Sequence, residues 1–230
     1  MTMQGIRAIL FDKDGTLFDF QATWGAWAQS LLAELAAGDP ARTRAMAEAM
    51  DFDLDRRLFR PASVVIAGTG REVAELLAPF TEVPVGVLEQ RISAAAHGAP
   101  LVPSVPLRPL LARLRAAGLK LGVATNDFEA VARSHVEEVL DLFDFVAGFD
   151  SGHGGKPEPG MLLAFAHACG VPPEAVLMVG DSRHDLIAGR RAGMATLAVL
   201  TGVATEADLA DLADAVRPDI GHLPGLLGVA

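Results

Sequence analysis

Two carboxylates, Asp12 and Asp14, stand two residues apart where the apolar run Ile6–Phe11 ends before Gly15. The run is typical of a buried strand, and open α/β sheets bind ligands at the carboxyl ends of their strands. Alternate residues of an extended chain share a side, so both carboxylates can face one site while Lys13 points away. Such a pair can act as nucleophile and proton donor, or hold a divalent metal. Taken alone, the same residues also fit a solvated turn.

Polar side chains also follow three later apolar segments. Thr125 and Asn126 come after one of them, with backbone amides at a helix start that suit an anion. A glycine-rich loop places Lys156 immediately before an expected proline-started helix, where it can be a fixed point charge. Asp181 and Asp185 follow the third of these segments, Ala175–Val179. Oxygen ligands suit Mg²⁺, and lysine with amides suits phosphate oxygens, so the combination indicates metal-assisted phosphoryl transfer.

Hydrophobic patterning predicts the elements that position these residues. From about residue 101, apolar strand candidates alternate with helix-length segments, which predicts βαβ units and a parallel sheet. The strand candidates are Lys120–Ala124, Phe143–Phe149, Ala175–Val179 and Ala195–Leu200, with a weaker one at Pro218–Ile220. Helical spacing marks Trp24–Ala37, Arg42–Met50, Arg71–Pro79, Val87–Ala96 and Leu107–Ala117. We therefore expect an α/β fold with a Rossmann-like three-layer core at 1–17 and 101–230, interrupted by a helical cap at 18–100.

Composition limits the classes of partner. The chain has 230 residues, is 51% hydrophobic and carries a formal net charge of −10. The negative charge argues against nucleic acid or an anionic membrane surface as a partner. Cys169 is the single cysteine, so neither an intrachain disulfide nor a cysteine-based zinc site can form. Without a targeting segment or an 18-residue apolar run, the expectation is a cytoplasmic protein. A monomer or homodimer is expected, and the sequence does not decide between them.

Together, the four motifs resemble those of the haloacid dehalogenase superfamily. They read Asp12-Lys13-Asp14-Gly15-Thr16, Thr125-Asn126, Lys156-Pro157 and Gly180-Asp181-Ser182-Arg183-His184-Asp185. The helical insert after the first motif resembles the alpha-helical cap of the phosphoglycolate-phosphatase-like branch. The resemblance implies a Mg²⁺-dependent phosphatase that hydrolyses a small phosphorylated metabolite, either phosphoglycolate-like or a sugar phosphate.

The resemblance also implies roles for individual residues. Asp12 would be the nucleophile that forms an aspartyl-phosphate, and Asp14 would protonate the leaving alcohol and then activate water. Mg²⁺ would lie between the Asp12 carboxylate, the Asp14 backbone carbonyl and Asp181. The transferring phosphoryl group would be bound by Thr125, Asn126 and Lys156, with Asp185 orienting the lysine or the metal shell.

Two alternatives stay open at this level, a phosphomutase of the beta-phosphoglucomutase type and a catalytically silent regulator on the same fold. Asp14 argues against haloacid dehalogenation, because the dehalogenase branch lacks this second carboxylate. In the cap, Arg60 and Arg71 flank the apolar turn Val64–Gly70, so they are the expected contacts for a substrate carboxylate. Lys13 is expected to be a surface cation or to act behind the residues that contact substrate.

Overall fold

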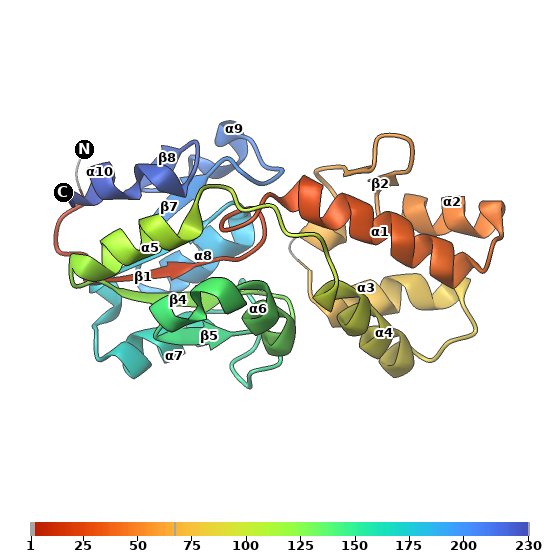
Figure 1. Cartoon of the computed structure of the whole chain (residues 1–230), viewed down its shortest axis with the longest axis horizontal. Helices are drawn as coiled ribbons and strands as arrows, with labels where there is room; N and C mark the ends of the chain where they lie inside the picture. Colours follow the sequence, from red (N-terminus) through yellow and green to blue (C-terminus); the bar gives the residue numbers. More distant parts are fainter. Residues whose placement is uncertain (1–2, 67, 230) are drawn as a thin grey trace.

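The computed structural model describes residues 3–66 and 68–229. Six parallel strands form one sheet in the order β5-β4-β1-β6-β7-β8. Figure 1 shows this sheet with its helices on one side of the molecule and a group of helices, α1 to α4, on the other. The strands are β1 (Ala8–Phe11), β4 (Lys120–Ala124), β5 (Phe145–Ala147), β6 (Val176–Gly180), β7 (Ala195–Val199) and β8 (Ala215–Arg217). The predicted α/β fold with a parallel sheet is confirmed.

Helices cover both faces of the sheet, so its central strands are apolar throughout. In β1, Ile9 and Phe11 pack in one apolar cluster, and Ala8 and Leu10 pack in another. This alternation follows from the two-residue period of a strand. The first face is covered by α5 (Leu107–Ala116), α6 (Glu129–His135) and α10 (Leu223–Leu227), and the second by α7 (Gly160–Cys169) and α8 (Arg183–Ala192). A short helix, α9 (Glu206–Leu209), follows β7.

The last strand lies three residues earlier than the sequence predicted. It is β8, in which Arg217 pairs with Val199 of β7, and not Pro218–Ile220. A proline has no amide hydrogen to donate, so the ladder ends there. Beyond it, Asp219 caps a short 3₁₀ turn at Ile220–His222 by accepting a hydrogen bond from the amide of Gly221 at 2.8 Å.

The four helices that follow β1 in the sequence pack around an apolar cluster of their own. They are α1 (Phe20–Ala36), α2 (Pro40–Ala49), α3 (Gly70–Leu77) and α4 (Val85–His97). Helix α1 begins earlier than its apolar pattern suggested, because Asp19 caps it by accepting from the amide of Ala22 at 2.8 Å. A small antiparallel hairpin joins β2 (Phe52–Asp53) to β3 (Leu58–Phe59). The remaining 3₁₀ turns are Val64–Ile66, Ala78–Phe80, Glu137–Leu142 and Pro173–Ala175.

Two short segments join this helical group, called the cap below (residues 20–97), to the sheet. They run side by side, because the amide of Asp19 donates to Val102 at 2.8 Å and that of Ser104 donates to Leu17 at 2.9 Å. Val131 of α6 is buried within the cap's own apolar cluster, so the cap rests on the sheet domain. None of the helices in the described ranges has both the length and the apolar character that crossing a bilayer requires.

Candidate active site

The carboxyl ends of β1, β4 and β6 meet where the strand order reverses, at the centre of the sheet. The amide of Asp12 continues the ladder by donating to Val179 at 2.8 Å, and the chain then turns at Gly15. Gly15 has φ +82°, and a Cβ there would lie 2.3 Å from a carboxylate oxygen of Asp181. Only glycine meets both conditions, so the turn that follows the first motif allows Asp181 to approach it. The sequence predicted this convergence of strand ends, since parallel strands share one such edge.

Lys156 joins the nucleophile candidate to the last motif. Its Nζ lies 2.5 Å from Asp12 Oδ1 and 2.6 Å from Asp185 Oδ1, and it donates to the Ala124 carbonyl at 2.8 Å. The backbone of Lys156 is fixed by Asn126, whose side-chain oxygen accepts from the lysine amide at 2.7 Å and whose Nδ2 donates to the lysine carbonyl at 2.8 Å. The expectation that Lys156 directly precedes a helix was wrong, because α7 begins four residues later. Asn126 provides the fixed geometry instead.

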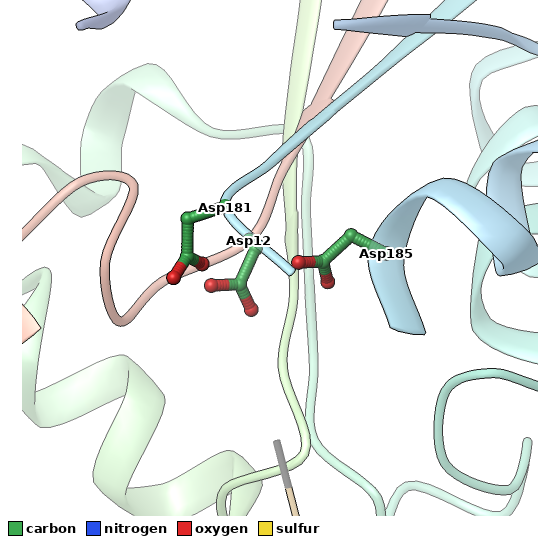
Figure 2. A group of neighbouring side chains, drawn as sticks. All are labelled: Asp12, Asp181 and Asp185. Carbon is green, nitrogen blue, oxygen red and sulfur yellow. The ribbon is translucent and has the colours of Figure 1, made fainter. Parts of the chain in front are cut away.

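Three buried carboxylates gather beside this lysine. Oxygen atoms of Asp12, Asp181 and Asp185 lie within 4.8 Å of one another, at the ends of β1, β6 and the start of α8 (Figure 2). Asp185 is held by Ser182, whose hydroxyl donates to it at 2.6 Å. Gly202 packs against the cluster from the other side, since a Cβ there would lie 1.6 Å from Asp181 Oδ2. Lys156 thus contacts Asp12 and Asp185, Ser182 holds Asp185, and the space beside Gly202 limits where Asp181 can lie.

Burial governs the protonation of the cluster. It raises the pKa of Asp12 to about 7, with Lys156 opposing this rise and Asp185 adding to it. Burial also raises the pKa of Asp181, and the negative charges of Asp12 and Asp185 raise it further. For Lys156, burial lowers the pKa but the two carboxylates more than offset it, so the ammonium stays charged. Carboxylates crowded in this way fit a hard divalent cation, which would relieve their repulsion with oxygen ligands.

Lys13 is fully buried, and the expectation of a surface cation was wrong. Its Nζ lies 2.6 Å from Asp14 Oδ2, 3.2 Å from Asp127 Oδ2 and 3.0 Å from His135 Nδ1. Burial lowers the pKa of Lys13, but Asp14 and Asp127 more than offset this, and the net pKa is raised. The lysine therefore stays charged and contacts the second carboxylate of the first motif directly.

His135 extends this contact to the cap. Its Nε2 lies 2.9 Å from the carbonyl oxygen of Ala96, in the last turn of α4. Because the Lys13 ammonium can only donate to Nδ1, the imidazole hydrogen must be on Nε2 and is donated to Ala96. Burial lowers the pKa of His135 to about 4, and the charge of Lys13 lowers it too. The neutral imidazole thus links Asp14, through Lys13, to a cap helix, which no local sequence pattern could have indicated.

One pocket collects the predicted core residues and the inner side of the cap. It is lined by Asp12, Asp14, Thr125, Asn126, Lys156, Asp181 and Asp185 together with cap residues that include Phe20, Trp24, Trp27, Val73 and Ile92. Arg60 and Arg71 do not line it. Arg60 pairs instead with Asp51 at 3.0 Å, and Arg71 pairs with Glu75 at 2.8 Å. The structure thus brings together the seven predicted core residues and leaves out the two arginines.

Comparison with known proteins identifies the family to which the chain belongs. The model of the haloacid dehalogenase-like hydrolase family matches residues 6–193. The chain belongs to this family. A phosphoglycolate phosphatase of Neisseria meningitidis is 28% identical, covering 96% of this chain and 92% of that protein. Another phosphoglycolate phosphatase, from Photorhabdus laumondii, is 32% identical, covering 83% of this chain and 79% of that protein.

Solved structures show the same fold. The crystal structure of a predicted phosphoglycolate phosphatase from Haemophilus somnus superposes with a TM-score of 0.74, covering 97% of this chain and 99% of that one. Its sequence identity is 18%, so this likeness concerns the fold alone. With the family and its phosphatase relatives, the chain is a haloacid dehalogenase-type phosphatase, a phosphoric monoester hydrolase of the phosphoglycolate-phosphatase-like branch.

Proposed function

We propose that this protein is a Mg²⁺-dependent phosphatase that hydrolyses a small phosphorylated metabolite through an aspartyl-phosphate on Asp12. The observation that carries the proposal is the position of Asp12. Its carboxylate lies 2.5 Å from the Lys156 ammonium and within 4.8 Å of ligand oxygens from Asp181 and Asp185, in one pocket beneath the cap. A nucleophile, a fixed cation and a candidate metal site thus share one small space.

In the first step, a carboxylate oxygen of Asp12 attacks phosphorus as the bond from phosphorus to the ester oxygen breaks. The leaving alkoxide takes a proton from Asp14. In the second step, Asp14 takes a proton from water as that water attacks phosphorus, which releases phosphate and restores the Asp12 carboxylate. Asp14 Oδ2 is held by Lys13, whereas its Oδ1 is buried and has no hydrogen-bond partner among the described residues. That free oxygen is the atom suited to carry the proton.

Other groups orient the phosphoryl oxygens. The hydroxyl oxygen of Thr125 accepts from the amide of Asp127 at 3.1 Å, which leaves the hydroxyl hydrogen for a phosphoryl oxygen. Lys156 contributes positive charge beside Asp12. Asp12 and Asp181 would hold Mg²⁺, with the Asp14 carbonyl and Asp185 beside them, and the ion would neutralise charge between two anions that must meet.

Phosphate release from a panel of small phosphate esters tests this proposal. Each ester is measured with Mg²⁺, with a chelator, and with the Asp12→Asn variant. We expect release that requires Mg²⁺ and disappears in the variant, because the amide is not a nucleophile. A folded protein that binds Mg²⁺ but releases no phosphate from any ester would contradict the proposal and favour the mutase or the silent regulator.

A further inference from the structure

We propose that the alcohol half of the substrate is uncharged and largely apolar, so that the enzyme prefers phosphate esters of small apolar alcohols over those of hydroxy acids such as glycolate. The inference rests on the proposed phosphatase function and concerns the part of the same pocket that holds the leaving group. It is carried by three features of that pocket, which are the wall formed by the cap, the placement of the cap's cations, and the charge balance of the sheet side.

The wall that the cap contributes is apolar. Its described lining residues are Phe20, Trp24, Trp27, Val65, Ile66, Gly68, Gly70, Val73, Ile92 and Ala96. None of these side chains carries a charge. The indole nitrogens of Trp24 and Trp27 are buried and have no acceptor within the described chain, so the cap offers at most neutral donors. A leaving group that enters this space exchanges water for aromatic and aliphatic contacts, which favours apolar groups.

The cations of the cap lie elsewhere. None of the arginine and histidine residues in the described part of the cap lines the pocket. Arg71, at the start of α3, is next to the lining residue Gly70, yet its guanidinium pairs with Glu75 at 2.8 Å and with Glu89 at 3.4 Å. Arg60 is about half exposed and pairs with Asp51. A substrate carboxylate in the cap half would therefore find no counterion.

The sheet side of the pocket is already rich in negative charge. Its described lining carries the carboxylates Asp12, Asp14, Asp127, Asp181 and Asp185, whereas the basic side chains there are Lys156 and the imidazole of His184. That lysine is shared between Asp12 and Asp185, and Lys13 behind the wall is shared between Asp14 and Asp127. A bound divalent cation would be balanced by the phosphoryl group itself. A second anionic group on the substrate would thus be desolvated without compensation, which is costly in an enclosed site.

The test compares esters that share their shape and differ in charge. Phosphoglycolate is measured against isobutyl phosphate, in which two methyl groups replace the carboxylate oxygens, and against the neutral amide of phosphoglycolate. Benzyl phosphate and 4-carboxybenzyl phosphate form a second, larger pair. With Mg²⁺ present, we expect kcat/KM for each uncharged ester to exceed that of its carboxylate partner by about tenfold or more.

Two neighbouring substitutions separate a local effect of the pocket from a general effect of charge. Val65 lines the pocket and is partly buried, whereas Val64 is 37% exposed and does not line it. Val65→Arg supplies the missing counterion and should shift the preference toward phosphoglycolate by about tenfold. Val64→Arg adds the same charge one residue away and should leave the preference unchanged.

The possible outcomes distinguish this inference from the function on which it rests. Hydrolysis of the panel with phosphoglycolate ahead of isobutyl phosphate would overturn the inference and leave the phosphatase proposal intact. An equal shift in preference from both arginine variants would also overturn it, since the apolar cap lining of the pocket would then not be what selects the substrate. If no ester is hydrolysed at all, the phosphatase proposal fails, and this inference fails with it.

Discussion

At the scale of single residues, the site depends on how buried charges are matched. Lys13 is fully buried, and its ammonium lies between Asp14 and Asp127 at 2.6 and 3.2 Å. The pKa of Asp127 is raised, mainly by burial, with Lys13 opposing the rise and Asp14 adding to it. The positive charge of the lysine thus offsets the repulsion and the burial cost of two neighbouring carboxylates in the folded protein.

Replacing Lys13 should therefore destabilise the folded protein. We expect Lys13→Met to lower the free energy of unfolding by about 3 kcal/mol at pH 7, because two buried carboxylates lose their counterion. Urea unfolding measures this loss. Lys120→Met is the matched control, since Lys120 is an exposed lysine that pairs with Asp144, and exposed pairs contribute about 1 kcal/mol or less. Equal losses in the two variants would show that Lys13 is not the counterion that this site needs.

His135 gives a second prediction, on pH dependence. Its pKa is lowered from 6.5 to about 4 in the folded protein, so between these values the unfolded chain binds the proton more strongly. Stability from this group is therefore present above pH 6.5 and is lost as the pH falls toward 4. Relative to His135→Gln, which cannot titrate, the wild-type protein should lose about 2 kcal/mol between pH 7 and pH 5. Parallel stability curves for the two proteins over this range would exclude a buried neutral imidazole.

At the scale of elements, the site is formed by short segments after strands, and two glycines allow them to approach. Gly15 and Gly202 leave the space that Asp181 occupies, as the close approach of a Cβ built at either position shows. The turn after β1 is further tied to the segment after β7, because Thr201 donates to the carbonyl of Gly15 at 2.6 Å. These segments are rigidly spaced by the parallel sheet beneath them.

A methyl group at Gly202 should therefore disturb the proposed metal site more than the fold. In Gly202→Ala the new Cβ would lie 1.6 Å from Asp181 Oδ2, so the carboxylate must move. We expect affinity for Mg²⁺ to fall by about tenfold or more, measured by the shift of the melting temperature with Mg²⁺ concentration. Gly86→Ala, where nothing lies within 4 Å of the added Cβ, is the control. Unchanged Mg²⁺ affinity in Gly202→Ala would show that Asp181 is not a ligand of the proposed metal ion.

Elements were also the level at which the sequence was most informative. Five strands, β1 and β4 to β7, could be predicted, because buried parallel strands are continuous apolar runs. The polar motif residues after the first four of these strands could be predicted with them. The last strand was misplaced because Pro218 and Ile220 continue an apolar pattern that the missing proline amide interrupts. Contacts of Lys13 with His135 and of His135 with Ala96 join residues 122 and 39 positions apart, so no local period could reveal them.

At the scale of the whole molecule, the pocket lies between the sheet domain and the cap. Two segments that run side by side connect them, and the contact between His135 and Ala96 adds a polar link beside the apolar one at Val131. The sheet side of the pocket supplies charged groups, and the cap supplies aromatic and aliphatic ones. Figure 1 shows the sheet domain and the cap helices on opposite sides of the molecule. In the proposed function, the sheet side carries out the reaction and the cap selects the leaving group, so the core motifs predict the reaction class and not the substrate.

The proposed aspartyl-phosphate is tested most directly by trapping it. In the Asp14→Asn variant, para-nitrophenyl phosphate still transfers its phosphoryl group, since nitrophenolate leaves without a proton, but the second step lacks its base and slows by about a hundredfold or more. With Mg²⁺ and an acid quench, we predict that peptide mass spectrometry finds a phosphoryl group on Asp12. The Asp12→Asn variant should show none. Hydrolysis of the ester by Asp14→Asn without any phosphoryl group on Asp12 would contradict the mechanism.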